Sequence, residues 1–319
     1  MRPSIQPITI DCQYLNPEFA AAYLLVEGKK AAFIENNTAH STPLLLEALR
    51  EQGLTPDQVE FLIVTHVHLD HAGGSYSLLK ACPQATLLAH PRAAPHLIDP
   101  SKLIASAQKV YGAEAFDKLY GEIKPIESHR VRIMQDGEVV KFGGRTLSFI
   151  YTRGHANHHF CIFDSQSQSI FTGDSFGIAY PLLQKHGLFI FPSTSPTDFD
   201  PTEARISIER ILETKAKTAY LTHFGGVENL REAADQLNRH LDFSAELLNR
   251  ANRYSEDKLS LDQYCKNELT SYFKTTLEKK GYHLNQKEWT LLDLDLDLNA
   301  AGIAHVVRKK RQAPKDKAN

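Results

Sequence analysis

The chain has 319 residues, of which 42% are hydrophobic and 23% are charged, so it can bury a sizeable globular core. Its formal net charge of −2 excludes the broad positive field that would hold nucleic acid or an anionic membrane. The beginning of the chain lacks a continuous apolar segment of the length that a signal peptide or a membrane anchor needs. We therefore expect a cytoplasmic protein that binds a small-molecule substrate and neither nucleic acid nor a membrane.

Short apolar runs rich in β-branched and aromatic residues predict strands through the first two thirds of the chain. These runs lie at residues 23–28, 31–36, 61–66, 86–91, 147–155, 160–165, 169–174 and 218–226. Residues 41–53 have Ser and Thr near the start, a Pro in the first turn and a Gly at the end, a pattern typical of a helix. Strands with intervening helices indicate a mixed α/β fold.

Two regions depart from this pattern. Residues 91–121 have the sequence of short helices broken by Pro and Gly, which indicates a helical insertion able to cover a site. Residues 229–319 show amphipathic helical periodicity, so we expect a C-terminal helical region that packs on the first domain or forms a homodimer contact. The predicted domains are thus a main domain over residues 1–228 and a helical region over residues 229–319.

Three other patterns do not indicate binding sites. The stretch LDLDLDLNAAG at residues 292–302 is similar to a calcium-binding loop, but Leu298 stands where such a loop has a glycine. We therefore predict an acidic segment that leads into a final helix. The basic residues within 308–317 are typical of a solvated chain end. The four cysteines form no CxxC pair, which argues against a thiolate zinc site and a disulfide framework.

The segment THVHLDH follows directly on an apolar run and places His66, His68, Asp70 and His71 close together. Such polar side chains are costly to bury unless something pairs with them. Histidines two positions apart in an extended segment point the same way, so His66 and His68 can bind one cation. Asp70 and His71 follow at once and can serve a second ion beside the first.

Three further residues of the metal-binding type each follow a strand-like run and lie beside a glycine. They are His155 in TRGHAN, Asp174 in FTGDS and His223 in LTHFGG. Strand ends that meet at one edge of a sheet are the usual way in which an open α/β layer builds a site. Nitrogen and carboxylate ligands without sulfur suit zinc, iron or manganese.

These residues resemble the signature of the metallo-β-lactamase superfamily, whose HxHxDH motif is matched from His66 to His71. The resemblance spans residues 20–226 and implies an αββα sandwich, with two β-sheets between outer helices, as the catalytic domain. It implies that His66, His68 and His155 bind a first metal ion, that Asp70, His71 and His223 bind a second, and that Asp174 bridges the two. The implied cofactors are two divalent metal ions, with zinc favoured and iron or manganese as alternatives.

The Asp-His ending of the motif resembles the glyoxalase II and lactonase branches of the superfamily. No stretch similar to GCGR follows Asp174, which argues against glyoxalase II. Lactonases place a tyrosine shortly after the bridging aspartate to contact the substrate carbonyl, and Tyr180 stands in a comparable place as a candidate substrate-binding residue. His158 and His159, just beyond His155, are expected to support the ligands or to pack.

The function that these residues predict is hydrolysis of an ester, lactone or thioester bond by a hydroxide that bridges two metal ions. Asp70 is the candidate catalytic residue, orienting the water and passing its proton to the leaving group. Phosphodiester hydrolysis remains an alternative, although no basic face is evident. A di-iron redox or oxygen-binding protein is another, although that branch resembles HxExDH, with a glutamate in place of His68. A non-catalytic sensor would not need so complete a ligand set.

Overall fold

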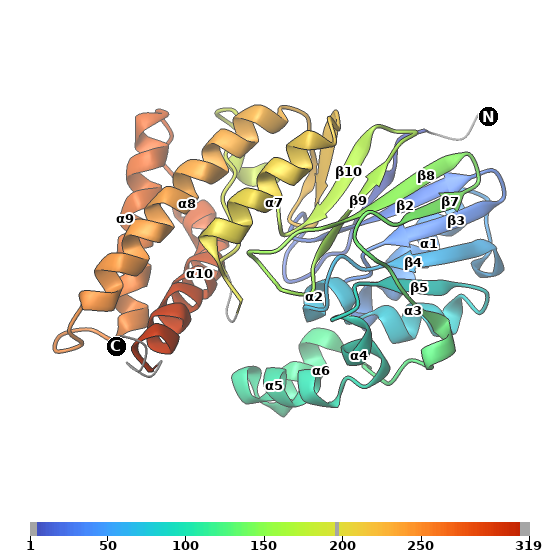
Figure 1. Ribbon diagram of the computed structural model, residues 1–319, viewed down its shortest axis with the longest axis horizontal. Helices are drawn as coiled ribbons and strands as arrows, with labels where there is room; N and C mark the ends of the chain where they lie inside the picture. The colour runs from blue at the N-terminus through green and yellow to red at the C-terminus, as the bar shows by residue number, and fades with distance from the viewer. Residues whose placement is uncertain (1–4, 195–197, 313–319) are drawn as a thin grey trace, which may run out of the picture.

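The computed structural model describes residues 5–194 and 198–312, and its centre consists of two β-sheets packed face to face (Figure 1). The first sheet has the order β1 (Ile8–Asp11), β2 (Ala21–Glu27), β3 (Lys30–Ile34), β4 (Val59–Ile63), β5 (Thr86–Ala89) and β6 (Val131–Ile133). The second has the order β12 (Gly225–Val227), β11 (Thr218–Leu221), β10 (Ser169–Gly173), β9 (Phe160–Asp164), β8 (Arg145–Tyr151) and β7 (Val139–Phe142). Strands β3 to β6 are parallel, and β10 pairs in parallel with β11.

Alternation of side chains along each strand divides the apolar residues between two faces. On β2, Tyr23 and Leu25 point into the core between the two sheets, where they meet residues of the second sheet such as Phe149. Ala22 and Leu24 point the other way, toward the helices that cover the first sheet. Both faces of β2 are buried, which explains why its sequence is almost continuously apolar.

Helices cover the outer face of each sheet. The first sheet packs against α1 (Thr42–Glu51), α3 (Ser75–Ala81) and α4 (Ala94–Ile98). The second packs against α7 (Pro201–Glu213) and α8 (Leu230–Arg253), with Ile208 and Leu237 among the contacting residues. The resulting order of helix, sheet, sheet and helix confirms the predicted αββα sandwich. Each strand predicted from the sequence is present, except that the run at residues 218–226 forms two strands, β11 and β12. The strands β1, β6 and β7 are not predicted from the sequence.

The helical insertion and the C-terminal helices are both present. The insertion contains α4, α5 (Ser101–Tyr111) and α6 (Ala113–Tyr120). The C-terminal region contains α8, α9 (Leu261–Lys279) and α10 (Gln286–Gln312), which gather at one end of the sandwich (Figure 1). Its apolar residues belong to the same core cluster as the outer face of the second sheet. The division at residues 228 and 229 stays a prediction. No helix in the described part of the chain has both the length and the apolar character to span a lipid bilayer.

The prediction for residues 292–302 is wrong in one respect, because this stretch lies inside α10 and does not lead into it. Leu292 and Leu296 are four positions apart and buried, as are Asp295 and Asn299 one turn apart. The alternation of Leu and Asp in the sequence therefore conceals a helical periodicity, in which buried residues recur every four positions. The beginning of the basic stretch completes α10, where Arg308 pairs with Asp262, and residues 313–317 lie outside the described residues.

We predict that the C-terminal helices and the sandwich unfold together. Phe273 of α9 is 2% exposed, and its ring centre lies 5.2 Å from that of Phe191 and 5.8 Å from that of Phe189. Phe273→Ala should lower the free energy of unfolding by about 3–5 kcal/mol in a single denaturant transition. Leu294→Ala, at a position 39% exposed, is the control and should stay within about 0.5 kcal/mol of the wild type. A main transition unaffected by Phe273→Ala, with a separate early one, would show that the helices form an independent unit.

Candidate metal centre

The HxHxDH loop leaves the first sheet at the end of β4 and turns into the short helix α2 (Leu69–Ala72). Two glycines make the turn possible. A Cβ atom on Gly73 would lie 2.4 Å from the Leu69 carbonyl oxygen, and one on Gly74 would lie 2.6 Å from the Asn36 carbonyl oxygen. A larger residue at Gly74 would push the loop off the segment that follows β3, and one at Gly73 would clash with the backbone of α2. The glycines that end HLDHAGG thus hold the histidine loop against the sheet.

His66, His68 and His155 form the first group of ligands. Nε2 of His155 lies 3.2 Å from Nε2 of His66 and 3.0 Å from Nδ1 of His68. A neutral imidazole carries only one N–H, so nitrogens that converge in this way cannot all satisfy one another. A cation at the centre would accept all their lone pairs. The structure thus brings together the residues expected to bind the first ion.

Asp70, His71 and His223 form the second group. Nε2 of His223 lies 3.4 Å from Oδ2 of Asp70, and Nε2 of His71 lies 3.8 Å from the same oxygen. His71 is on α2, whereas His223 follows β11 in the other sheet. The second group therefore forms only where the two sheets meet.

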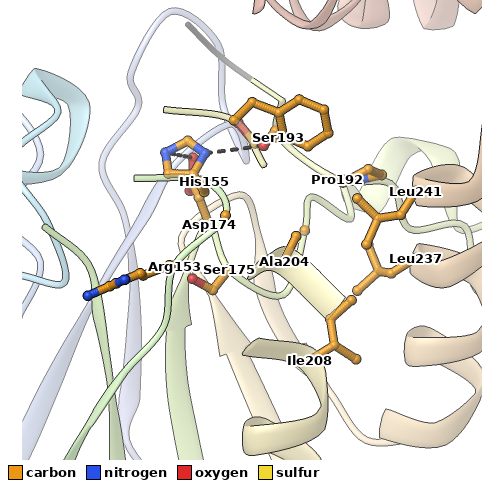
Figure 2. A pocket seen from close by; sticks show the side chains of 13 residues that line it. Arg153, His155, Asp174, Ser175, Pro192, Ser193, Ala204, Ile208, Leu237 and Leu241 are labelled. Atoms are coloured by element: carbon orange, nitrogen blue, oxygen red, sulfur yellow. Dashed lines mark hydrogen bonds and ion pairs between the residues drawn. The ribbon is translucent and has the colours of Figure 1, made fainter. Parts of the chain in front are cut away.

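Asp174, which follows β10, faces both groups. Its Oδ2 lies 3.4 Å from Nε2 of His155, and its Oδ1 lies 3.2 Å from Nε2 of His71 and 3.7 Å from Nε2 of His223. Figure 2 shows Asp174 beside His155. Each carboxylate oxygen is thus directed at a different group of ligands, which is the geometry that a bridging ligand needs.

Backbone carbonyls hold two of the ligand rings from behind. Nδ1 of His155 donates to the carbonyl oxygen of Ser193 over 3.2 Å, as Figure 2 shows, and Nδ1 of His223 donates to that of Phe19 over 2.8 Å. Because a carbonyl only accepts, Nδ1 of each ring carries a proton, and Nε2 is the nitrogen that faces the site. The two rings are therefore oriented so that Nε2 can bind a metal ion once it is unprotonated.

Glu35 supports the third ring and is not among the site residues predicted from the sequence. Nδ1 of His71 lies 3.2 Å from Oε1 of Glu35, which also accepts hydrogen bonds from the hydroxyls of Thr65 and Thr222. Glu35 is 1% exposed, so these contacts replace the water that its carboxylate would otherwise need. It directly follows β3, as Asp174 follows β10, but it lacks the neighbouring glycine that accompanies Asp174 and His223 in the sequence.

Burial and mutual charge set the ionisation of the site. Burial, together with the neighbouring histidines, holds the pKa of His66 well below its usual range, which leaves the ring neutral. Burial also lowers the pKa of His223, but the carboxylates of Asp174 and Asp70 outweigh this effect and raise it to about 9. Burial raises the pKa of Asp174, yet the charges of His71, His155 and His223 bring it well below the usual range. Burial also raises the pKa of Asp70, but His71 and His223 bring it well below the usual range, so both aspartates are available as anions.

The residues present fit a divalent metal ion. Nε2 of His71 and Oδ1 of Asp174 are buried, and neither makes a hydrogen bond of good geometry within the described part of the chain. They lie 3.2 Å apart, and Oδ1 of Asp174 lies 3.7 Å from Nε2 of His223. A buried polar atom without a hydrogen bond costs about 1–3 kcal/mol, which a metal–ligand bond would offset. The imidazole and carboxylate ligands are those preferred by zinc, iron or manganese.

Tyr180 is not arranged as a freely exposed substrate contact. It is 1% exposed, its hydroxyl donates to Oδ1 of Asp295 over 3.3 Å, and its ring stacks on that of Phe19 at 4.9 Å. Its role in substrate binding stays a prediction. Asp295, which comes from α10, is not predicted from the sequence to lie near the site, and burial raises the pKa of its carboxyl to about 7.

His158 and His159 lie beside the first ligand group. The ring centre of His158 is 5.7 Å from that of His68. Nδ1 of His159 lies 2.8 Å from the hydroxyl of Thr152 and 3.1 Å from that of Ser175. Neither belongs to the groups of side chains that converge as metal ligands.

Comparison with known proteins gives a family for this arrangement. A model described as the metallo-beta-lactamase superfamily matches residues 15–235. A metallo-beta-lactamase fold-containing protein of Sulfurisphaera tokodaii is 28% identical over 213 residues, which cover 66% of this chain and 74% of that protein. An atrochrysone carboxyl ACP thioesterase of Aspergillus fumigatus is 24% identical over 179 residues, which cover 56% of this chain and 42% of the fungal protein.

Solved structures show the same fold. The crystal structure of the archaeal protein from Sulfurisphaera tokodaii has a TM-score of 0.64 at 22% identity. The match covers 94% of this chain and 99% of the archaeal chain. A metallo-beta-lactamase family protein from Thermus thermophilus has a TM-score of 0.65 at 17% identity, with 96% of this chain and 93% of the other covered. The family match and the thioesterase relative support metal-dependent hydrolysis in general. Because the family model matches most of its length, this chain belongs to the metallo-beta-lactamase superfamily.

Proposed function

We propose that the protein is a binuclear metal-dependent hydrolase that cleaves an ester, lactone or thioester bond of a small molecule. The observation that supports this most strongly is the position of Asp174, with Oδ2 directed at His155 and Oδ1 at His71. A carboxylate so placed can bind two cations at once, and two cations roughly 3.5–4 Å apart are typical of two-metal hydrolases. We favour zinc at both positions, with iron and manganese as alternatives, because imidazole and carboxylate ligands suit all three.

Asp70 is the residue of the chain that we expect to transfer protons during hydrolysis. Bound divalent ions would supply water of lowered pKa and would polarise a substrate carbonyl. The side chain of Asp70 is 28% exposed, whereas that of Asp174 is 6% exposed, so Asp70 is the carboxylate that attacking water can reach. His71 and His223 outweigh the effect of burial and hold the pKa of Asp70 well below its usual range. Asp70 can therefore accept a proton from water as an anion and pass it to the leaving group.

The C-terminal helix bears on the choice of substrate. Near the site α10 places an acid, Asp295, and an amide, Asn299, and neither attracts an anion. A glutathione thioester carries carboxylates, and neither of these side chains offers them a positive charge. The fungal relative is a thioesterase, which supports thioesters as a class. An uncharged acyl group agrees with the apolar and aromatic residues around Phe19 and Tyr180.

The first prediction of this proposal concerns metal content. Protein purified without chelator should contain about two transition-metal ions per chain by elemental analysis, because two groups of ligands converge on either side of Asp174. Dialysis against a chelator should abolish hydrolysis, and added zinc should restore it. Metal content that stays near zero after reconstitution with zinc, iron and manganese would refute the proposal.

The second prediction compares two substitutions. Asp174→Ala should weaken the second ion most and reduce hydrolysis by several orders of magnitude, because it removes the ligand directed at both groups. His158→Ala is the matched control beside the same ligands and should cost about 10- to 100-fold. Circular dichroism should change little in either variant. Retention of two ions and near-normal turnover by Asp174→Ala, with their loss in His158→Ala, would require a different ligand assignment.

The third prediction concerns reaction class. In assays of the zinc-loaded protein, kcat/KM should be higher for lactones and simple esters than for glutathione thioesters, because Asp295 and Asn299 of α10 offer glutathione no positive charge. Phosphodiesters should be poor substrates for the same reason. A strong preference for a glutathione thioester or a phosphodiester would contradict this order, and oxygen consumption in place of hydrolysis would point to redox chemistry.

A further inference from the structure

Asn299 of α10 joins the C-terminal region to a short segment that borders the metal centre. Its side-chain oxygen accepts a hydrogen bond from the backbone N–H of Thr194 over 2.6 Å, and its Nδ2 donates to the carbonyl oxygen of Pro192 over 3.1 Å. Its own carbonyl oxygen accepts a hydrogen bond from the hydroxyl of Thr194 over 3.1 Å. Asn299 is 4% exposed, so water does not compete for these bonds.

Asn299 holds Pro192 and Thr194, and the residue between them is Ser193. The carbonyl oxygen of Ser193 accepts the hydrogen bond from Nδ1 of His155. Figure 2 shows Ser193 beside His155, with the bond drawn. We propose that Asn299 is a positioning residue for the candidate metal ligand His155, and that it acts by fixing the Ser193 carbonyl.

The chemistry of the side chain supports this role. An amide both accepts and donates, so one residue can hold the N–H of Thr194 and the carbonyl of Pro192 at the same time. Alanine would release both, and the buried backbone groups would have to move to find new partners. A shift of the Ser193 carbonyl would leave Nδ1 of His155 without its acceptor and free the ring to turn. Loss of such a supporting contact typically weakens metal binding by about 10- to 100-fold.

The experiment measures zinc affinity by competition with a chromophoric chelator, which needs no substrate. Asn299→Ala should weaken one zinc-binding step by about 10- to 100-fold. Asn285→Ala is the matched control, because Asn285 precedes the same helix and bonds to the backbone N–H of Glu288 at its first turn. This control removes an amide and weakens the start of α10 without touching the segment at Ser193, and zinc affinity should stay within about twofold of the wild type. An equal loss in both variants would overturn the proposal in favour of a general role in folding.

A double-mutant cycle with His155→Ala tests whether Asn299 acts through that ring. If it does, Asn299→Ala should cause no further loss of zinc affinity once His155 is absent, whereas additive losses would overturn the proposal. Thr194→Val removes the hydrogen bond from the Thr194 hydroxyl to the carbonyl oxygen of Asn299. It should give a smaller loss of zinc affinity, and this loss should also be absent when His155 is replaced by alanine. This second variant keeps the proposal testable if Asn299→Ala folds poorly. The inference rests on the ligand assignment of the proposed function. Unchanged zinc affinity in His155→Ala refutes both, whereas a loss there with none in Asn299→Ala or Thr194→Val refutes only the positioning role.

Discussion

The carboxylate of Asp174 is the constraint around which the rest of the site is arranged. Two divalent ions about 4 Å apart would repel each other by on the order of 15 kcal/mol at an effective dielectric constant of about 20. A shared anion between them, with a second anion at Asp70, offsets much of that repulsion. The histidines then need only direct their lone pairs inward, and every support behind them serves that purpose. The fold can be understood as the means of holding one carboxylate between two groups of imidazoles.

The two sheets divide this task. The first sheet supplies the histidine loop after β4, and the second supplies Asp174 after β10 and His223 after β11. Neither sheet holds a complete site, so the ligand groups depend on the core between the sheets. The supports come from three separate places: Phe19 before β2, Glu35 after β3 and Ser193 before α7. Small displacements at any of them would turn a ring within the site.

The sequence is a good guide wherever a side chain both defines the local structure and carries the chemistry. The HxHxDH loop has its glycines, and Asp174 and His223 stand at strand ends, so their convergence follows from the pattern. The support of a ligand ring by a backbone carbonyl cannot be predicted from the sequence, because any residue at position 193 would supply the same carbonyl. Asn299 is missed for another reason. The Leu and Asp alternation around it suggests an acidic segment, and only the packing of α10 shows that Asp295 and Asn299 share a buried face.

The location of Asn299 on α10 also bears on how the protein is made. Synthesis proceeds from the N-terminus, so all strands of both sheets leave the ribosome before α10 does. The nascent chain therefore contains every candidate ligand before Asn299 can form its hydrogen bonds to Pro192 and Thr194. Metal could be captured early by a loosely held His155 and the ring fixed later, when the last helix docks. Biosynthesis would then separate the loading of the centre from its final alignment.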